Sequence, residues 1–286
     1  MPWLPEKNET LPQKLALVEP GFSEVVQRLP PRNEPVFPGD WLHLEMIERY
    51  AVLRHAGIQA GANVLELGAG AHALATVPLA YLVGNTGRVV AVELERWHSF
   101  GDVVGSSGLS RRVIPVACDA TRLPFPFECF DLAVIVHGIR SMRDEGTISR
   151  ILREMLRLSP RIFVAESLPV ARTRAQEAHL EMYNLREEIF EARLGRPDDI
   201  RYLPLEKITE LIEDAGGRVF ESTVLDIGLP HFLAFIPRKY VEGIPDGEKR
   251  DNLLRRWEAA YAKIVEHGEE HPPAAVITAV RGTDRS

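Results

Sequence analysis

A short apolar run that ends in two closely spaced glycines constrains this chain more than any other feature. Residues 63–67 (NVLEL) have the composition of a buried strand, and Gly68 and Gly70 follow directly. Residues 71–83 then have the composition of a helix, rich in Ala and Leu and closed by Gly84. Glycine lacks a Cβ and tolerates positive φ, so such a turn lets a ligand approach the backbone. The segment predicts a strand, turn and helix with a ligand site at the turn.

The alternation of strand and helix continues along the chain. Further strands are predicted at 88–92, 113–117, 130–136, 161–165, 218–227 and 231–236. Further helices are predicted at 41–56, from 95, and at 144–158, 174–194, 205–215 and 246–266. The last two strands have a short connection and should pair antiparallel, whereas Pro78 should kink its helix. We therefore expect an α/β fold: a doubly wound, mostly parallel seven-stranded sheet with a final antiparallel strand and helices on both faces.

The domain organisation follows from where this alternation begins and ends. Residues 1–40 contain eight prolines, which remove backbone donors, and we expect an arm there with one short helix. Residues 41–240 should form one domain, with a helical insertion at about 172–200 packed beside or over the site. Residues 241–286 should form a C-terminal helix and an irregular tail.

Composition excludes several classes of protein. The formal charge of -7 argues against a broadly basic surface for nucleic acid. Cys118 and Cys129 are the only cysteines, so neither a zinc site, a disulfide scaffold nor a three-cysteine iron–sulfur cluster is expected, and no metal is predicted. No run approaches the ~20 apolar residues of a membrane span. We expect a cytoplasmic protein without membrane contact, and the sequence leaves a homodimer open.

Charge near the glycine turn indicates which ligand it suits. The glycines alone also fit the G-x-G-x-x-G/A form of a dinucleotide site, with Ala73 at its end. Glu66, however, lies two residues before Gly68, and no Lys or Arg occurs between Arg54 and Arg88. A pyrophosphate would be repelled there, by about 1 to 4 kcal/mol in watery surroundings, whereas a cationic amino group or sulfonium would be attracted. A carboxylate that only caps nearby helix donors is the alternative.

Acidic residues also end the next two strands. Glu93 follows Gly70 at close to the ~20 residues at which a carboxylate accepts from both ribose hydroxyls. Asp119 follows the strand at 113–117, where it could accept from an adenine amino group. An exposed strand-end acid and a turn-capping Asp are the respective alternatives.

These segments together resemble a known family. The residues that carry the likeness are, in order, Val64 to Gly70 (VLELGAG), Val92-Glu93, Asp119-Ala120, Leu123-Pro124-Phe125 and Phe130-Asp131. They are similar to the class I S-adenosylmethionine-dependent methyltransferases, over roughly residues 57–237. The resemblance implies S-adenosylmethionine as cofactor, S-adenosylhomocysteine as product, and a final antiparallel strand matching 231–236.

The resemblance also implies roles for particular residues. The predicted cofactor residues are Glu66, Leu67, Gly68, Ala69, Gly70 and His72 at the methionine part, Glu93 and Leu94 at the ribose, Asp119 and Ala120 at the adenine, and His137. Many members have a third glycine where this chain has His72, which should narrow the turn and change how the methionine end is held.

His137 is the candidate catalytic residue, because it follows the strand at 130–136 at the edge where such sites face their acceptor. A neutral imidazole there could take a proton from an oxygen or nitrogen nucleophile. The alternative is a histidine that only lines the pocket, since methyl transfer by in-line displacement needs little beyond alignment.

Four arginines raise a hypothesis about the acceptor. They follow two adjacent strands and are Arg140, Arg143, Arg172 and Arg174. If they gather at one rim, the acceptor is anionic; the alternative is a solvated face paired with Glu145, Glu177 and Glu181.

The sequence therefore predicts an S-adenosylmethionine-dependent methyltransferase that methylates an oxygen or nitrogen of a small molecule, with protein or RNA as lesser options. The position after the fourth strand reads HGIR from His137 to Arg140, not the Asn/Asp-Pro-Pro-Tyr run of adenine methylases, so base methylation is not expected. Two other classes stay open: an NAD(P)-dependent oxidoreductase and a binding or scaffold protein without turnover.

Overall fold

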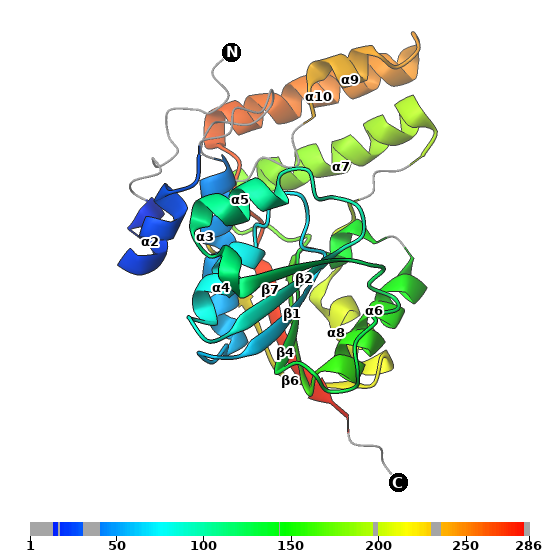
Figure 1. Cartoon of the computed structure of the whole chain (residues 1–286). Coiled ribbons are helices and arrows are strands. Elements are labelled where there is room, and N and C mark those ends of the chain that lie inside the picture. Colours follow the sequence, from blue (N-terminus) through cyan, green and yellow to red (C-terminus); the bar gives the residue numbers. More distant parts are fainter. Residues whose placement is uncertain are drawn as a thin grey trace.

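The computed structural model describes residues 14–16, 18–30, 41–142, 144–196, 200–229 and 236–282. Its centre is one seven-stranded sheet with the order β3-β2-β1-β4-β5-β7-β6 (Figure 1). The strands are β1 Asn63–Leu67, β2 Arg88–Glu93, β3 Val113–Ala117, β4 Leu132–Val136, β5 Arg161–Ser167, β6 Gly217–Leu225 and β7 Ala274–Arg281. Strands β1 to β5 pair in parallel, and β7 is antiparallel to both β5 and β6. The predicted mostly parallel sheet with one antiparallel strand is confirmed.

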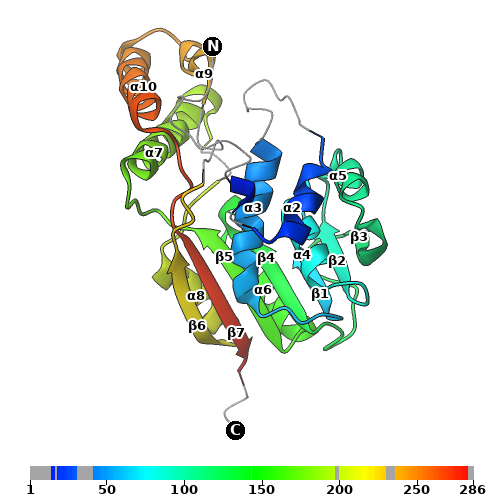
Figure 2. The same cartoon turned by 90° about the vertical axis from the view of Figure 1, so that its left-hand side faces the viewer.

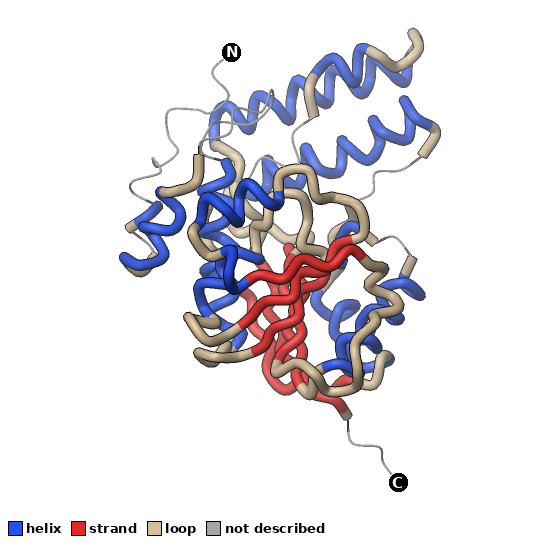
Figure 3. The backbone as a smooth tube through the Cα atoms, in the orientation of Figure 1, coloured by secondary structure: helices blue, strands red, loops and turns tan. Residues whose placement is uncertain are grey.

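Helices cover both faces of this sheet (Figures 2 and 3). On one face, an apolar cluster joins the sheet to α2 Pro20–Gln27, α3 Trp41–Leu53, α4 Thr76–Leu82 and α5 Phe100–Ser107. On the other face, a second cluster joins it to α6 Glu145–Leu158 and α8 Leu205–Asp214. Short 3-10 turns at Arg54–Ala56, Ser110–Arg112 and Ile139–Ser141 complete the connections. The central parallel strands β1, β4 and β5 are therefore buried on both faces, which explains their continuous apolar runs in the sequence, whereas the edge strand β3 is mostly exposed.

The position of the antiparallel strand corrects the sequence prediction. Residues 230–235 lie outside the described part, and Ile236 belongs to no strand. The strand is β7, where an irregular tail was expected, and its residues 274–279 are all buried between β5 and β6. Its AAVITAVR run has the apolar, β-branched composition of an interior strand. The division into arm, domain and C-terminal segment stays a prediction, but residues 274–281 belong to the sheet.

Three helices form a separate layer above the edge where the parallel strands end (Figures 1 and 2). They are α7 Arg174–Leu194, α9 Arg238–Glu242 and α10 Glu248–His267, and they share their own apolar cluster. The predicted helix at 174–194 is confirmed, and its Met182, Leu185 and Ile189 are buried against the other two helices. None of the helices in the described ranges is long and apolar enough to span a bilayer.

The helix after the glycine turn starts later than predicted. α4 begins at Thr76, so Pro78 lies in its first turn, where a missing N–H breaks no helical hydrogen bond. The prediction that Pro78 kinks its helix is therefore wrong. Residues 68–75 instead form an extended turn above the sheet edge.

Candidate functional site

The glycine turn adopts the backbone shape that its sequence requires. Gly68 and Gly70 have φ of 71° and 67°, in the left-handed region that favours glycine. The amides of Gly68 and Ala69 both donate to the carbonyl of Val92, at 2.9 and 3.0 Å, which ties the turn to the end of β2. A Cβ on Gly68 would meet nothing within 4 Å, so the space above this backbone is open. The turn can therefore receive a ligand at close range.

This turn is one wall of a cavity of about 800 Å³, a volume typical of small-molecule sites. The ends of β1, β2, β3 and β4 all contribute to its lining. Of the predicted cofactor residues, those that line it are Glu66, Gly68, Ala69, Gly70, His72, Glu93, Leu94, Asp119, Ala120 and His137. Leu67 is buried in β1 and does not line the cavity. The structure thus brings Glu66 and His137, which are 71 positions apart in sequence, to one edge of the sheet.

Glu93 connects the turn to the end of β2. Its Oε2 accepts from the Gly70 amide at 3.0 Å, and its Oε1 accepts from the Leu94 amide at 2.8 Å. A carboxylate has about four lone-pair directions, so further acceptor capacity faces the cavity. Glu93 is therefore able to hold the turn and accept from a ligand together.

Glu66 is a buried carboxyl in an apolar setting. It is 2% exposed, and its Oε2 has no hydrogen-bond partner among the described residues. Burial, and to a lesser extent the charge of Glu93, raises the pKa of Glu66 to about 8, although the nearby Thr76 hydroxyl lowers it in part. Near neutral pH this carboxyl therefore holds its proton until a cation arrives in the cavity.

Asp119 caps its own turn. Its Oδ1 accepts from the Thr121 amide and hydroxyl, both at 2.8 Å, and the backbone bond in particular lowers the pKa of Asp119. This is the geometry of the turn-capping alternative. Asp119 also lines the cavity, so the two roles coexist at this position.

His72, in the place of the third glycine, lies against aromatic rings. Its ring meets Trp41 of α3 edge-on at 5.0 Å between centroids, and His98 edge-on at 5.5 Å. The next residue, Ala73, takes up a φ of 51°, so the left-handed step occurs one position later. How the methionine end of a cofactor is held here stays a prediction.

His137 follows β4 in a conformation that is uncommon outside glycine, with φ of 51°. Its Nε2 lies 3.1 and 3.2 Å from the two oxygens of Glu48, and its Nδ1 lies 3.3 Å from Oε1 of Glu166. The hydroxyl of Ser167 lies at 3.3 Å from the same Nδ1, so two groups face this nitrogen. The role of His137 as a proton acceptor stays a prediction.

Sequence reasoning missed the partners of His137. Glu48 and Arg49 lie on α3, whose charged residues are buried together with its apolar face, and Arg49 lines the cavity. Burial alone would raise the pKa of Glu48, but the charges of His137 and Arg49 outweigh it and hold the pKa below its usual range. Nothing in the α3 sequence distinguishes these residues from a solvated face. Glu166, at the end of β5, offered the same strand-end signal as Glu66 and Glu93.

The four arginines do not share one rim. Arg140 is buried and lines the cavity, whereas Arg172 and Arg174 are exposed and are not part of its lining. Arg174 pairs with Glu177 at 2.7 Å, as the solvated alternative supposed. Arg143 lies outside the described residues.

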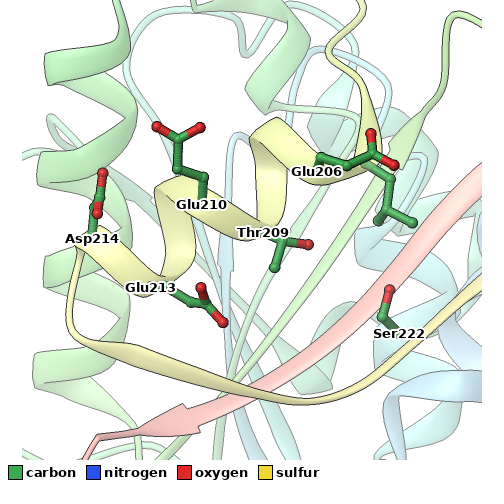
Figure 4. Close-up of a pocket in the computed structure, with 7 residues that line it drawn as sticks. Glu206, Thr209, Glu210, Glu213, Asp214 and Ser222 are labelled. Atoms are coloured by element: carbon green, nitrogen blue, oxygen red, sulfur yellow. The ribbon is translucent and has the colours of Figure 1, made fainter.

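A second depression lies on the surface of α8 and β6. Its lining is acidic, with Glu206, Glu210, Glu213 and Asp214 projecting from α8 and Ser222 from β6 (Figure 4). In the described part of the chain, no three His, Cys, Asp or Glu side chains are placed to hold a metal ion. The depression is therefore a solvated acidic surface.

The strand order and the site define a member of the class I S-adenosylmethionine-dependent methyltransferases, and comparison with known proteins confirms this class. Residues 42–186 match the ubiE/COQ5 methyltransferase family. The chain belongs to this family. S-adenosylmethionine is accordingly its cofactor, and the sequence prediction of that cofactor is confirmed.

Curated relatives agree with this assignment. The ubiquinone/menaquinone biosynthesis C-methyltransferase UbiE of Pseudomonas fluorescens is 31% identical over 162 residues, which cover 56% of this chain and 61% of that protein. The protein of the same name from Escherichia coli K12 is 28% identical over 178 residues, covering 58% and 69%. The chain thus spans less than two thirds of the length of the first of these relatives.

Solved structures share the fold. A cyclopropane-fatty-acyl-phospholipid synthase-like protein from Lactobacillus casei has a TM-score of 0.72 at 14% identity and covers 92% of this chain and 100% of its own. The [4+2]-cyclase SpnF has a TM-score of 0.54 at 19% identity, covering 98% and 99%. Because these two proteins are named for different reactions, the fold alone does not determine the chemistry.

Proposed function

We propose that this protein transfers the methyl group of S-adenosylmethionine to a small molecule bound in the 800 Å³ cavity. The observation that carries the proposal is Glu66, a carboxyl buried beside the glycine turn with an unpartnered oxygen. The amino group and the sulfonium of the cofactor are both cationic, so either would be attracted by this group when it ionises. The pyrophosphate of a dinucleotide would be repelled.

The strand order supports a layout for the cofactor. In the order β3-β2-β1-β4, Asp119 follows β3, Glu93 ends β2 and Glu66 lies in β1. The adenine, ribose and methionine parts then lie above successive strands, and the methyl group points toward β4. Ligands of open α/β sheets bind in this way, across the carboxyl ends of the strands at the reversal of strand order.

The acceptor is proposed to be small because the far wall of the cavity is deeply buried. Arg140 is 4% exposed and His137 is 7% exposed. A protein acceptor would have to insert a side chain, and a nucleic acid a flipped base, to reach this wall. The predicted target was oxygen or nitrogen; the relatives are named C-methyltransferases, which favours a carbon atom instead. A cytoplasmic location and a homodimer stay predictions.

Glu93→Ala is expected to weaken binding of S-adenosylhomocysteine about tenfold to a hundredfold, since it removes charge-assisted hydrogen bonds to the ribose and frees the Gly70 amide. Isothermal titration calorimetry measures the change. Asp102→Ala, an exposed acid on the next helix, is the matched control and should bind as the parent does. If Glu93→Ala binds S-adenosylhomocysteine with the parent's affinity, Glu93 is not part of the cofactor site.

The whole proposal is tested by calorimetry with S-adenosylmethionine, S-adenosylhomocysteine and NADH, followed by a screen of small molecules with labelled methyl donor. We expect both adenosyl compounds to bind and NADH not to bind. Binding of NADH alone would favour the oxidoreductase, and cofactor binding without any transfer would favour a scaffold. Mass spectrometry of the labelled product assigns the methyl to carbon, oxygen or nitrogen.

A further inference from the structure

The wall of the cavity above β4 and β5 is occupied by one arginine. Arg140 is 4% exposed, yet it lines the cavity. Its backbone amide donates to Oε2 of Glu166 at 2.9 Å, and its Nη1 donates to Oγ of Ser167 at 3.3 Å. Both partners lie at the end of β5, so the guanidinium is positioned on the side of β4 away from β1.

Most of the donors of Arg140 have no acceptor in the described structure. A guanidinium carries five N–H groups in a rigid fork, and here only the bond to Ser167 is within normal distance. The nearest carboxylate contact, from Nε to Glu166, is 3.8 Å long. The face of Tyr202 covers another side, 5.8 Å from the guanidinium carbon. The remaining donors are therefore available to a molecule in the cavity.

Glu166 is only partly available to these donors, because other groups already contact its oxygens. Oε1 lies 3.3 Å from Nδ1 of His137 and accepts from the Ser167 amide at 3.1 Å, while Oε2 accepts from the Arg140 amide. His137 beside it is held between Glu48 and Glu166. The wall thus presents a guanidinium next to a histidine ring.

We propose that this wall is an anion site, in which Arg140 binds a negatively charged oxygen of the methyl acceptor. The inference rests on the proposed function and names its substrate class: a molecule with a carboxylate, enolate or phenolate oxygen. Such an oxygen near the methyl group makes the acceptor electron-rich. A bond forms from the acceptor to the methyl carbon, the sulfur–methyl bond breaks with its electron pair left on sulfur, and the negative and positive charges cancel.

The carboxylate of the cofactor itself is the competing occupant. The strand order argues against it, because the methionine part lies over β1 and Arg140 lies over β4 and β5. Arg49 of α3 also lines the cavity, but its Nη1 is already paired with Glu45 and Glu48, both at 2.7 Å. Loss of Arg140 should then affect the acceptor and leave the cofactor unaffected.

The test uses 4-nitrophenol as probe, since its phenolate is yellow and its neutral ether, 4-nitroanisole, cannot ionise. The probe is added to protein saturated with S-adenosylhomocysteine, and absorbance reports the bound phenolate. We expect the parent protein to bind the phenolate and not to bind the ether. Arg140→Gln should weaken phenolate binding about tenfold or more, and Arg140→Lys, which keeps the charge, should weaken it less.

Two controls make the outcome decisive. Arg172→Gln, an exposed arginine outside the cavity, should behave as the parent does. Affinity for S-adenosylhomocysteine should be unchanged in Arg140→Gln, which also shows that this variant folds. Equal binding of phenolate in Arg140→Gln, no phenolate binding in the parent, or a tenfold loss of S-adenosylhomocysteine affinity in Arg140→Gln would each overturn the anion site. Failure of the parent to bind S-adenosylhomocysteine would instead count against the proposed function.

Discussion

Glu66→Gln is expected to stabilise the empty protein while it abolishes tight cofactor binding. The fold raises the pKa of this carboxyl to about 8, against 4.5 for the ordinary group. Between pH 4.5 and pH 8, the unfolded chain has released this proton whereas the folded chain keeps it. The free energy of unfolding therefore falls as the pH rises from about 4.5, and it levels off above about 8. At neutral pH this penalty is about 3 kcal/mol for a fully buried carboxyl, and glutamine avoids it.

Urea unfolding at about pH 5 and about pH 8 measures this difference. The parent should lose stability between the two pH values by more than Glu66→Gln does. Glu221→Gln, an exposed glutamate on β6, is the matched control and should follow the parent. If both variants lose stability equally, Glu66 does not have the raised pKa that its burial implies.

The same variant should bind S-adenosylmethionine about tenfold to a hundredfold more weakly, because the ammonium or sulfonium no longer meets an ionised partner. In the parent, cofactor binding should release a proton from Glu66, and calorimetry in buffers of different ionisation enthalpy detects it. The release should be absent in Glu66→Gln. A variant that is more stable but binds its ligand less tightly is expected where a buried group destabilises the empty protein and is used to bind the ligand.

The parallel half of the sheet was predictable from sequence because each buried strand is a continuous apolar run bounded by turn residues. β1 and β3 have the predicted bounds, and β2 extends one residue further, to Glu93. The candidate cofactor residues were predictable for a related reason. Parallel strands end at a common edge, so acidic residues at successive strand ends meet in space.

β7 was not predictable in the same way, since its position in the sheet depends on partners remote in sequence. It inserts between β5 and β6 only because the polypeptide returns from α10 to the edge where β5 ends. The charged residues of α3 escaped notice for another reason. A helix was predicted at 41–56, but its burial was not: all residues of Trp41–Tyr50 are buried, including the side that carries Glu45 and Glu48. Tertiary contacts with His137 and His271 bury that face, and periodicity carries no information about them.

Glu48→Gln should cost about 3 to 5 kcal/mol of stability, because it leaves the buried side chains of Arg49 and His137 without their common partner. Glu48 accepts from Arg49 at 2.7 Å and lies 3.1 Å from Nε2 of His137, and all three side chains are nearly inaccessible to water. The desolvation of these charges has to be offset by their mutual attraction. Glutamine keeps the shape of Glu48 and removes only the charge, so the loss reports electrostatics rather than packing.

The pH dependence of this loss has a definite sign. The folded pKa of Glu48 lies below its usual value, so its contribution to stability is present above about pH 4.5 and disappears as pH falls toward the folded pKa. The difference between parent and Glu48→Gln in urea unfolding should therefore shrink in acid. Glu24→Gln, which breaks an exposed pair with Arg28 on α2, is the control and should cost about 1 kcal/mol or less. The double variant Glu48→Gln/His137→Gln should recover part of the loss, since it removes one of the two groups left without its partner. Strictly additive losses in this cycle would mean that His137 is not held by Glu48.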